Sequence, residues 1–214
     1  MSNTYGSIHI KTEQSQQIIH MILDMYIGKP NEYEELLMLT QRLNIVCEGW
    51  NSFLQRSAQE ARPEFFIAVT DGWVSFYDCN MSYEDTPKSA RALAKKTKEP
   101  IVYMSCFDDD IFVFGLIENG RTKTSGRACA APDVYDITEK QAKMAEFYRV
   151  TGASMPEKRM KMPSDVMELE DLLSSIMPVP LMVYDEDAFK SLAEEYELTE
   201  EVKGIRVFKV KYRQ

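Results

Sequence analysis

The chain has little of what catalytic and metal sites are usually built from. It contains two histidines, His9 and His20, and four widely spaced cysteines with no C-x-x-C pair, so a cysteine and histidine zinc site is not expected. Its nine glycines are spread singly and build no phosphate-binding loop. The P-loop, G-x-G-x-x-G, G-x-S-x-G and H-E-x-x-H motifs are absent. The sequence predicts no cofactor and leaves open whether the chain is an enzyme.

The sequence also lacks long apolar runs and an excess of positive charge. No apolar run approaches the length that spans a bilayer, and residues 1–6 lack a basic region followed by an apolar stretch. We therefore expect a cytoplasmic protein that does not bind membranes. The net charge is −9, which is unsuited to general nucleic-acid binding but permits a basic protein partner. Solubility alone is an equally physical reason for this acidity.

The strongest pattern in the chain lies between Pro63 and Thr124. Asp71-Gly72 separates two β-prone runs, 65–70 and 73–77, which predicts a hairpin with a two-residue type I′ turn. That turn pairs Thr70 with Trp73 and places alternate side chains on opposite faces. One face is expected to lie in the core, and it carries Phe65, Ile67, Val69, Val74 and Phe76. The opposite face is aromatic but mixed.

The rest of this central stretch predicts one helix and three more strands. Thr86-Pro87 suits a helix start and Pro100 ends that helix. Residues 101–107 and 111–117 are nearly continuous apolar runs joined by an acidic turn, as in strands buried on both faces. A second turn signal at 118–121 predicts a further strand near 121–124. The unit therefore has the order β-β-α-β-β-β.

The flanking regions have weaker patterns. Before the central unit we expect a short strand at 8–10 and two helices, around 18–26 and 36–43, that pack together against the sheet. Residues 51–61 have helix-forming composition. After it we expect a loop at 125–136, helices beginning near Thr138 and Ser164, a last helix with Tyr196 inward, and an edge strand at 205–212.

These elements predict an α+β fold, with a mainly antiparallel sheet of five to seven strands packed against flanking helices. A single domain over residues 1–214 is the simpler interpretation. The alternative is a subdivision near 125–136, with a helical C-terminal part at 137–214.

Two groups of residues are candidate sites. The acidic turn Asp108, Asp109 and Asp110, with Asp78 in a neighbouring connection, offers the oxygen ligands that Mg²⁺ and Ca²⁺ prefer. A solvated turn explains the same residues, because adjacent side chains on a tight turn point apart and aspartate favours turns. The second group is an aromatic docking surface or, alternatively, part of the core. Its members are Phe66, Trp73, Tyr77 and Trp50.

Three functions are compatible with these features. The first is a non-enzymatic interaction or regulatory protein, immunity-like or adaptor-like, that binds a basic protein partner. The second is a small metal-assisted hydrolase that uses the carboxylates at the Asp108–Asp110 turn. The third is self-association as a homo-oligomer, through the aromatic face or the C-terminal edge strand. The convergence of carboxylates in a cleft would distinguish the hydrolase from the others.

Overall fold

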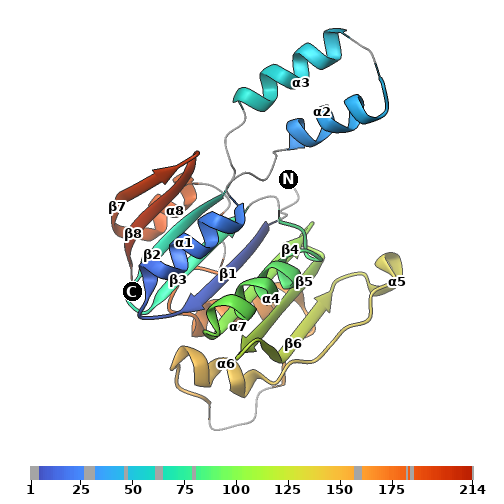
Figure 1. The fold of residues 1–214 in the computed structure, drawn as a ribbon. Helices are drawn as coiled ribbons and strands as arrows, with labels where there is room; N and C mark the ends of the chain where they lie inside the picture. Colours follow the sequence, from blue (N-terminus) through green and yellow to red (C-terminus); the bar gives the residue numbers. More distant parts are fainter. Residues whose placement is uncertain are drawn as a thin grey trace.

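The computed structural model describes residues 5–26, 32–45, 48–60, 65–78, 81–156, 161–181, 183 and 186–213. These residues form one eight-stranded sheet in the order β6-β5-β4-β1-β3-β2-β8-β7, with helices on both faces (Figure 1). The pairs are antiparallel except for β2 with β8, which is parallel. The predicted α+β class and mainly antiparallel sheet are confirmed. No helix in the described ranges is both long and apolar enough to cross a membrane.

The strands are β1 (Tyr5–Lys11), β2 (Phe65–Thr70), β3 (Trp73–Asp78), β4 (Ile101–Phe107), β5 (Ile111–Glu118), β6 (Arg121–Cys129), β7 (Ala193–Val202) and β8 (Ile205–Tyr212). The helices are α1 (Ser15–Tyr26), α2 (Glu32–Arg42), α3 (Glu48–Glu60), α4 (Thr86–Thr97), α5 (Pro132–Tyr135), α6 (Met144–Thr151), α7 (Val166–Ile176) and α8 (Glu186–Leu192).

The sheet buries apolar side chains on both of its faces. On the first face, α1 and α4 pack their buried residues, such as Ile22 and Leu93, against Ile8, Val74 and Phe76 of the central strands. On the second face, α6 and α7 cover β4 to β6, and α8 covers β2 and β8. We call these the α1–α4 face and the α6–α8 face.

The predicted hairpin between β2 and β3 has the expected register. Thr70 pairs with Trp73 and Phe66 pairs with Tyr77, and the side chains divide between the two faces as alternation requires. The turn type differs from the prediction, because only Gly72 of the two central residues has a positive φ, of 76°. A two-residue connection sets the register whichever of these residues is left-handed.

The helical hairpin expected from α1 and α2 is instead made by α2 and α3. These two helices lie side by side and extend away from one end of the sheet, while α1 packs on the sheet beside α4 (Figure 1). The apolar stripe of α1 is largely buried, with Ile22 at 0% exposure and only Met25 partly exposed. The stripe of α2 is not, with Leu39 at 47%.

Two helix predictions for the C-terminal part are wrong, and the loop expected at 125–136 instead contains the end of β6 and the short helix α5. The capping-box pattern at Thr138 starts no helix, because Lys140 exchanges two backbone hydrogen bonds with Arg127 beside β6, and α6 begins only at Met144. Tyr196 lies on strand β7 and not on a helix.

The strand expected at the sheet edge, β8, is an internal one. It lies between β2 and β7, so β7 becomes the edge and the sheet reaches eight strands. Lys203 and Gly204 connect β7 to β8, and their φ angles of 49° and 82° give this turn the left-handed backbone of a type I′ hairpin.

Gly6 allows β1 to pack closely against Met81 and Thr86, which lie before and at the start of α4. A Cβ at this position would lie 2.5 Å from Thr86 Oγ1 and 2.9 Å from Met81 Cβ. We expect Gly6→Ala to lower the free energy of unfolding by roughly 1–3 kcal/mol, because the core must shift to accept a methyl group. Urea denaturation measures this loss. The matched control is Gly49→Ala on α3, where no atom lies within 4 Å and alanine favours the helix. Equal stability of Gly6→Ala and wild type would contradict this packing.

Candidate interaction site

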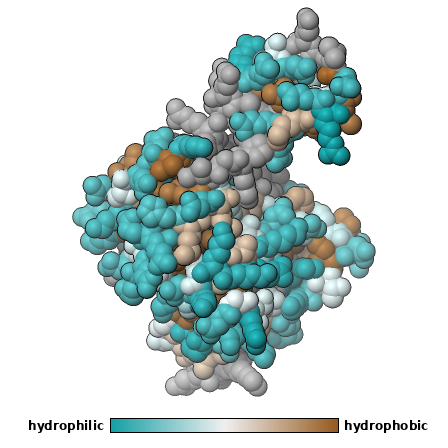
Figure 2. Space-filling view, viewed as in Figure 1, coloured by the Kyte–Doolittle hydropathy of each residue, from teal (hydrophilic) through white to brown (hydrophobic). Residues whose placement is uncertain are grey.

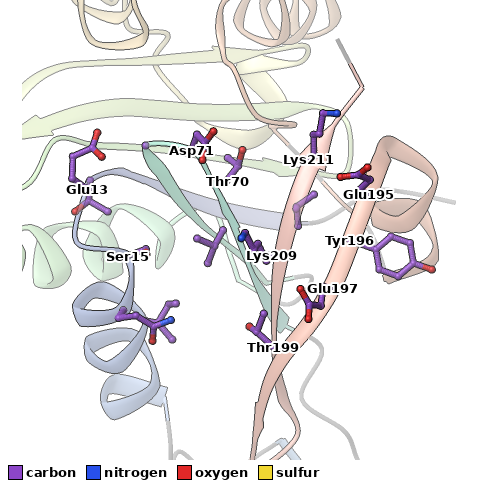
Figure 3. Close-up of a pocket in the computed structure, with 16 residues that line it drawn as sticks. Glu13, Ser15, Thr70, Asp71, Glu195, Tyr196, Glu197, Thr199, Lys209 and Lys211 are labelled. Carbon is purple, nitrogen blue, oxygen red and sulfur yellow. The ribbon is translucent and has the colours of Figure 1, made fainter.

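The β7 edge of the sheet borders a groove on the α1–α4 face. This groove has a volume of about 810 Å³ and lies between the start of α1, the β2–β3 turn and the β7–β8 ribbon. Figure 3 shows Glu195 and Glu197 on β7 at one side, and Glu13 and Asp71 at the other. Lys209 and Lys211 also line it, so its four carboxylates outnumber its two ammonium groups.

The pairing of β7 with β8 determines which of its side chains face this groove. Glu195 pairs with Lys211 and Glu197 with Lys209, and opposite charges directly across two strands stabilise an antiparallel pair. Lys211 Nζ also lies 3.3 Å from Glu194 Oε2 in a solvent-exposed ion pair. The register of β7 shifts on both sides of the segment 195–198, so that segment is the regular part of the edge.

The opposite side of β7 packs against α8. Tyr196 lies near the rings of Phe189 and Phe208, with centroid separations of 6.4 Å to each. The α8 helix is held to the sheet by Glu186, which forms ion pairs with Arg206 of β8 and with Lys190. Tyr196 nevertheless stays 49% exposed, as does Leu198. The edge therefore presents carboxylates on one side and partly exposed apolar surface on the other.

The predicted aromatic group is brought together only in part, since Phe66 and Tyr77 stack at a centroid separation of 5.2 Å while Trp50 lies apart on α3. Phe66, Trp73 and Tyr77 are 2%, 4% and 1% exposed and belong to the core of the α6–α8 face. The Tyr77 hydroxyl donates a hydrogen bond of 2.7 Å to the Pro180 carbonyl oxygen. Trp50 is different, since it is 45% exposed on α3 and stacks on Phe53 at a centroid separation of 5.4 Å. Only Trp50 of the four offers surface for a partner in this structure.

The predicted acidic residues lie on a tight turn. Asp108 and Asp109 have φ angles of 57° and 58° and are exposed. Asp110 instead accepts a hydrogen bond of 2.7 Å from the Tyr135 hydroxyl, and this bond raises the pKa of Tyr135 to about 12. Asp78 ends β3, on the far side of β1 from this turn. Within the ranges that the structure describes, no three His, Cys, Asp or Glu side chains are grouped so as to hold a metal ion.

A buried polar chain crosses the α6–α8 face. The Ser7 hydroxyl donates to the Leu181 carbonyl oxygen at 2.5 Å, so its oxygen accepts from His9 Nε2 at 3.0 Å. His9 Nδ1 then accepts from the Ser75 hydroxyl at 2.9 Å. Burial lowers the pKa of His9 to about 3, although a hydrogen bond with the Leu181 backbone acts to raise this pKa. This neutral histidine is fully enclosed and ties β1 to the segment that covers it.

The two cysteines that the structure describes, Cys106 and Cys129, show no sign of a reactive thiol. Cys106 is fully buried, and burial raises the pKa of its thiol to about 11. A raised pKa disfavours the nucleophilic thiolate. Cys129 is also buried and free, while Cys47 and Cys79 lie outside the described residues.

Sequence reasoning missed the residues that line the groove. Glu195 and Glu197 were expected on or after a helix, and a signal for the strand was present in Lys203-Gly204, which separates a glutamate-rich run from a lysine-rich one.

Comparison with known proteins gives no further information about the site. No family model matches the chain, and neither the curated proteins nor the solved structures include a match.

The buried His9 predicts a stability that depends on pH. Its pKa falls from 6.5 to about 3 on folding, so the unfolded chain takes up the proton first as the pH drops. The contribution of the neutral His9 to the free energy of unfolding is full above pH 6.5. It is lost progressively as the pH falls toward 3. Between pH 7 and pH 5 we expect wild type to lose about 2 kcal/mol more than His9→Gln, which cannot ionise.

Urea denaturation at the two pH values measures this difference. His20→Gln, at an exposed position on α1, controls for the loss of a histidine. Identical pH dependence of wild type and His9→Gln would show that His9 is not buried in its neutral form.

Proposed function

We propose that this chain is a non-enzymatic cytoplasmic interaction protein, regulatory in the manner of an immunity protein or an adaptor. It binds a basic, extended segment of a protein partner along β7. The observation that carries this proposal is the position of β7 at the sheet edge, with five glutamates and no basic residue.

The backbone of an edge strand supplies the affinity in this mode of recognition. A strand at the edge of a sheet has N–H and C=O groups on its outer side that a further strand can pair with. A partner segment that adds to β7 gains main-chain hydrogen bonds, and its alternate side chains enter the surfaces on either side. On one side these side chains meet the groove beside Glu195 and Glu197.

The charge of β7 selects the kind of segment. Two copies of β7 paired with each other would bring glutamates close together, and like charges directly opposite are destabilising. A segment rich in lysine or arginine reverses this effect, because its cations meet the excess of carboxylates in the groove. The same glutamates that keep the edge from pairing with itself therefore favour a basic strand.

The arrangement favours binding over the metal-assisted hydrolysis predicted as the alternative. Hydrolysis at the acidic turn needs carboxylates that converge on one ion. In the described part of the chain, Asp108 and Asp109 are exposed on the turn, Asp110 is engaged by Tyr135, and Asp78 lies across β1.

A seven-residue peptide that alternates lysine with threonine is the probe for this proposal. We expect it to protect the amides of 195–198 from hydrogen exchange, while a peptide with glutamate in place of lysine does not. Because the attraction is between exposed charges, affinity should fall several-fold between 50 and 300 mM salt. Calorimetric or NMR titration of the whole chain measures the affinity.

Variants of the edge test its charge directly. Glu195→Gln combined with Glu197→Gln should weaken the lysine peptide by about three- to tenfold. The matched control is Asp133→Asn combined with Glu139→Gln, which makes the same change in net charge at two exposed positions away from β7. Equal binding of both peptides, or protection of β6 in place of β7, would refute the proposal.

A further inference from the structure

The helical hairpin formed by α2 and α3 concentrates exposed apolar side chains. Of the thirteen large apolar residues that are exposed in the described ranges, seven lie between residues 36 and 53. They are Leu36, Met38, Leu39, Leu43, Ile45, Trp50 and Phe53. Brown, apolar residues are visible on this hairpin in Figure 2. Grouped apolar surface of this kind marks an interaction site more often than scattered single residues do.

Most of these residues form one continuous face. Leu36, Leu39 and Leu43 recur at spacings of three and four, so they make a stripe along α2. Because α2 and α3 pack on each other, we place their buried side chains Thr40 and Leu54 at the contact between the two helices. Helical geometry places the leucine stripe on the same side of this contact as the stacked rings of Trp50 and Phe53. The hairpin thus has an apolar side and a polar side.

The helices of this hairpin require their apolar face to be packed against another surface. The two helices have 11 and 13 residues, and isolated helices of that length are marginal in water without packing of an amphipathic face. The β7–β8 groove on the same chain does not complement leucine and tryptophan, because charged side chains line it.

The charges beside the leucine stripe match those of a second copy. Glu35 and Arg42 are both exposed and lie on the same flank of the stripe, near opposite ends of α2. When two α2 helices cross antiparallel about Leu39, Leu36 of one copy lies beside Leu43 of the other. The same crossing places Glu35 of each copy beside Arg42 of the other, which gives two opposite-charge pairs related by the two-fold axis.

We infer that the α2–α3 hairpin is a homodimerisation element, in which two hairpins pack face to face as an antiparallel four-helix bundle. Leu36, Leu39 and Leu43 form the centre of the interface together with Trp50 and Phe53. The Glu35 and Arg42 pairs set its antiparallel register, as flanking charges do in helical bundles. This surface is separate from β7, so the inference does not rest on the proposed function, and the double glutamine variant of β7 should dimerise as wild type does.

Charge reversal on the full chain tests the inference. We expect wild type to be a dimer in sedimentation velocity and native mass spectrometry. Glu35→Arg and Arg42→Glu should each weaken dimerisation about tenfold, because each change replaces two attractive pairs by two repulsive ones. Glu139→Arg, an exposed reversal outside the hairpin, is the control and should leave the dimer unchanged.

Mixing the two variants gives the sharpest result. One copy then carries arginine at both positions and the other carries glutamate at both, so the mixture should form a heterodimer about as tightly as the wild-type homodimer. The double variant Glu35→Arg/Arg42→Glu should likewise recover the homodimer. Because these positions are exposed, the variants are expected to fold, and far-ultraviolet circular dichroism checks this.

Three outcomes would overturn the inference. One is a wild-type chain that stays monomeric at 100 µM in the same measurements, which would mean that something other than a second copy covers the apolar face of the hairpin. Another is a dimer that neither single reversal weakens. The third is a mixture of the two variants that forms no heterodimer.

Discussion

Strand β1 is the element on which the two halves of this sheet depend. It pairs antiparallel with β3 on one side and β4 on the other, so β6-β5-β4 and β3-β2-β8-β7 form one sheet only through its hydrogen bonds. Its alternate side chains serve both layers, with Ile8 and Ile10 under α1 and α4 and the neutral His9 under the opposite cover. A segment of seven residues thus positions the basic-strand site proposed at β7, four strands away.

The sequence predicted those parts of the fold in which local chemistry determines pairing. Two-residue turns at Gly72 and Gly120 set the registers of β2 with β3 and of β5 with β6, and both hairpins could be inferred from turn residues between β-prone runs. Strand order could not be inferred in the same way. The central position of β1 depends on contacts between residues about 70 and 100 positions apart, which no local pattern reports.

The candidate site was missed for a related physical reason. The run from Ala193 to Val202 is rich in glutamate, which favours helices over strands when it is considered alone. Tertiary pairing overrides that preference, because Glu195 and Glu197 gain lysine partners on β8 only once the ribbon forms. The exposed Trp50 was among the predicted binding residues, but its position on the same side of the hairpin as the leucine stripe of α2 depends on how the two helices pack.

Charge and apolar surface have different roles in the two surfaces proposed for this molecule. The edge strand has accessible backbone groups, and its glutamates make pairing with a second copy unfavourable. The hairpin has no free strand edge, and its flanking Glu35 and Arg42 make pairing with a second copy favourable when the helices run antiparallel. Self-association through the hairpin would therefore leave β7 open to a basic segment. A dimer built in this way presents two such edges, and a partner with two basic segments gains from both without any new contact.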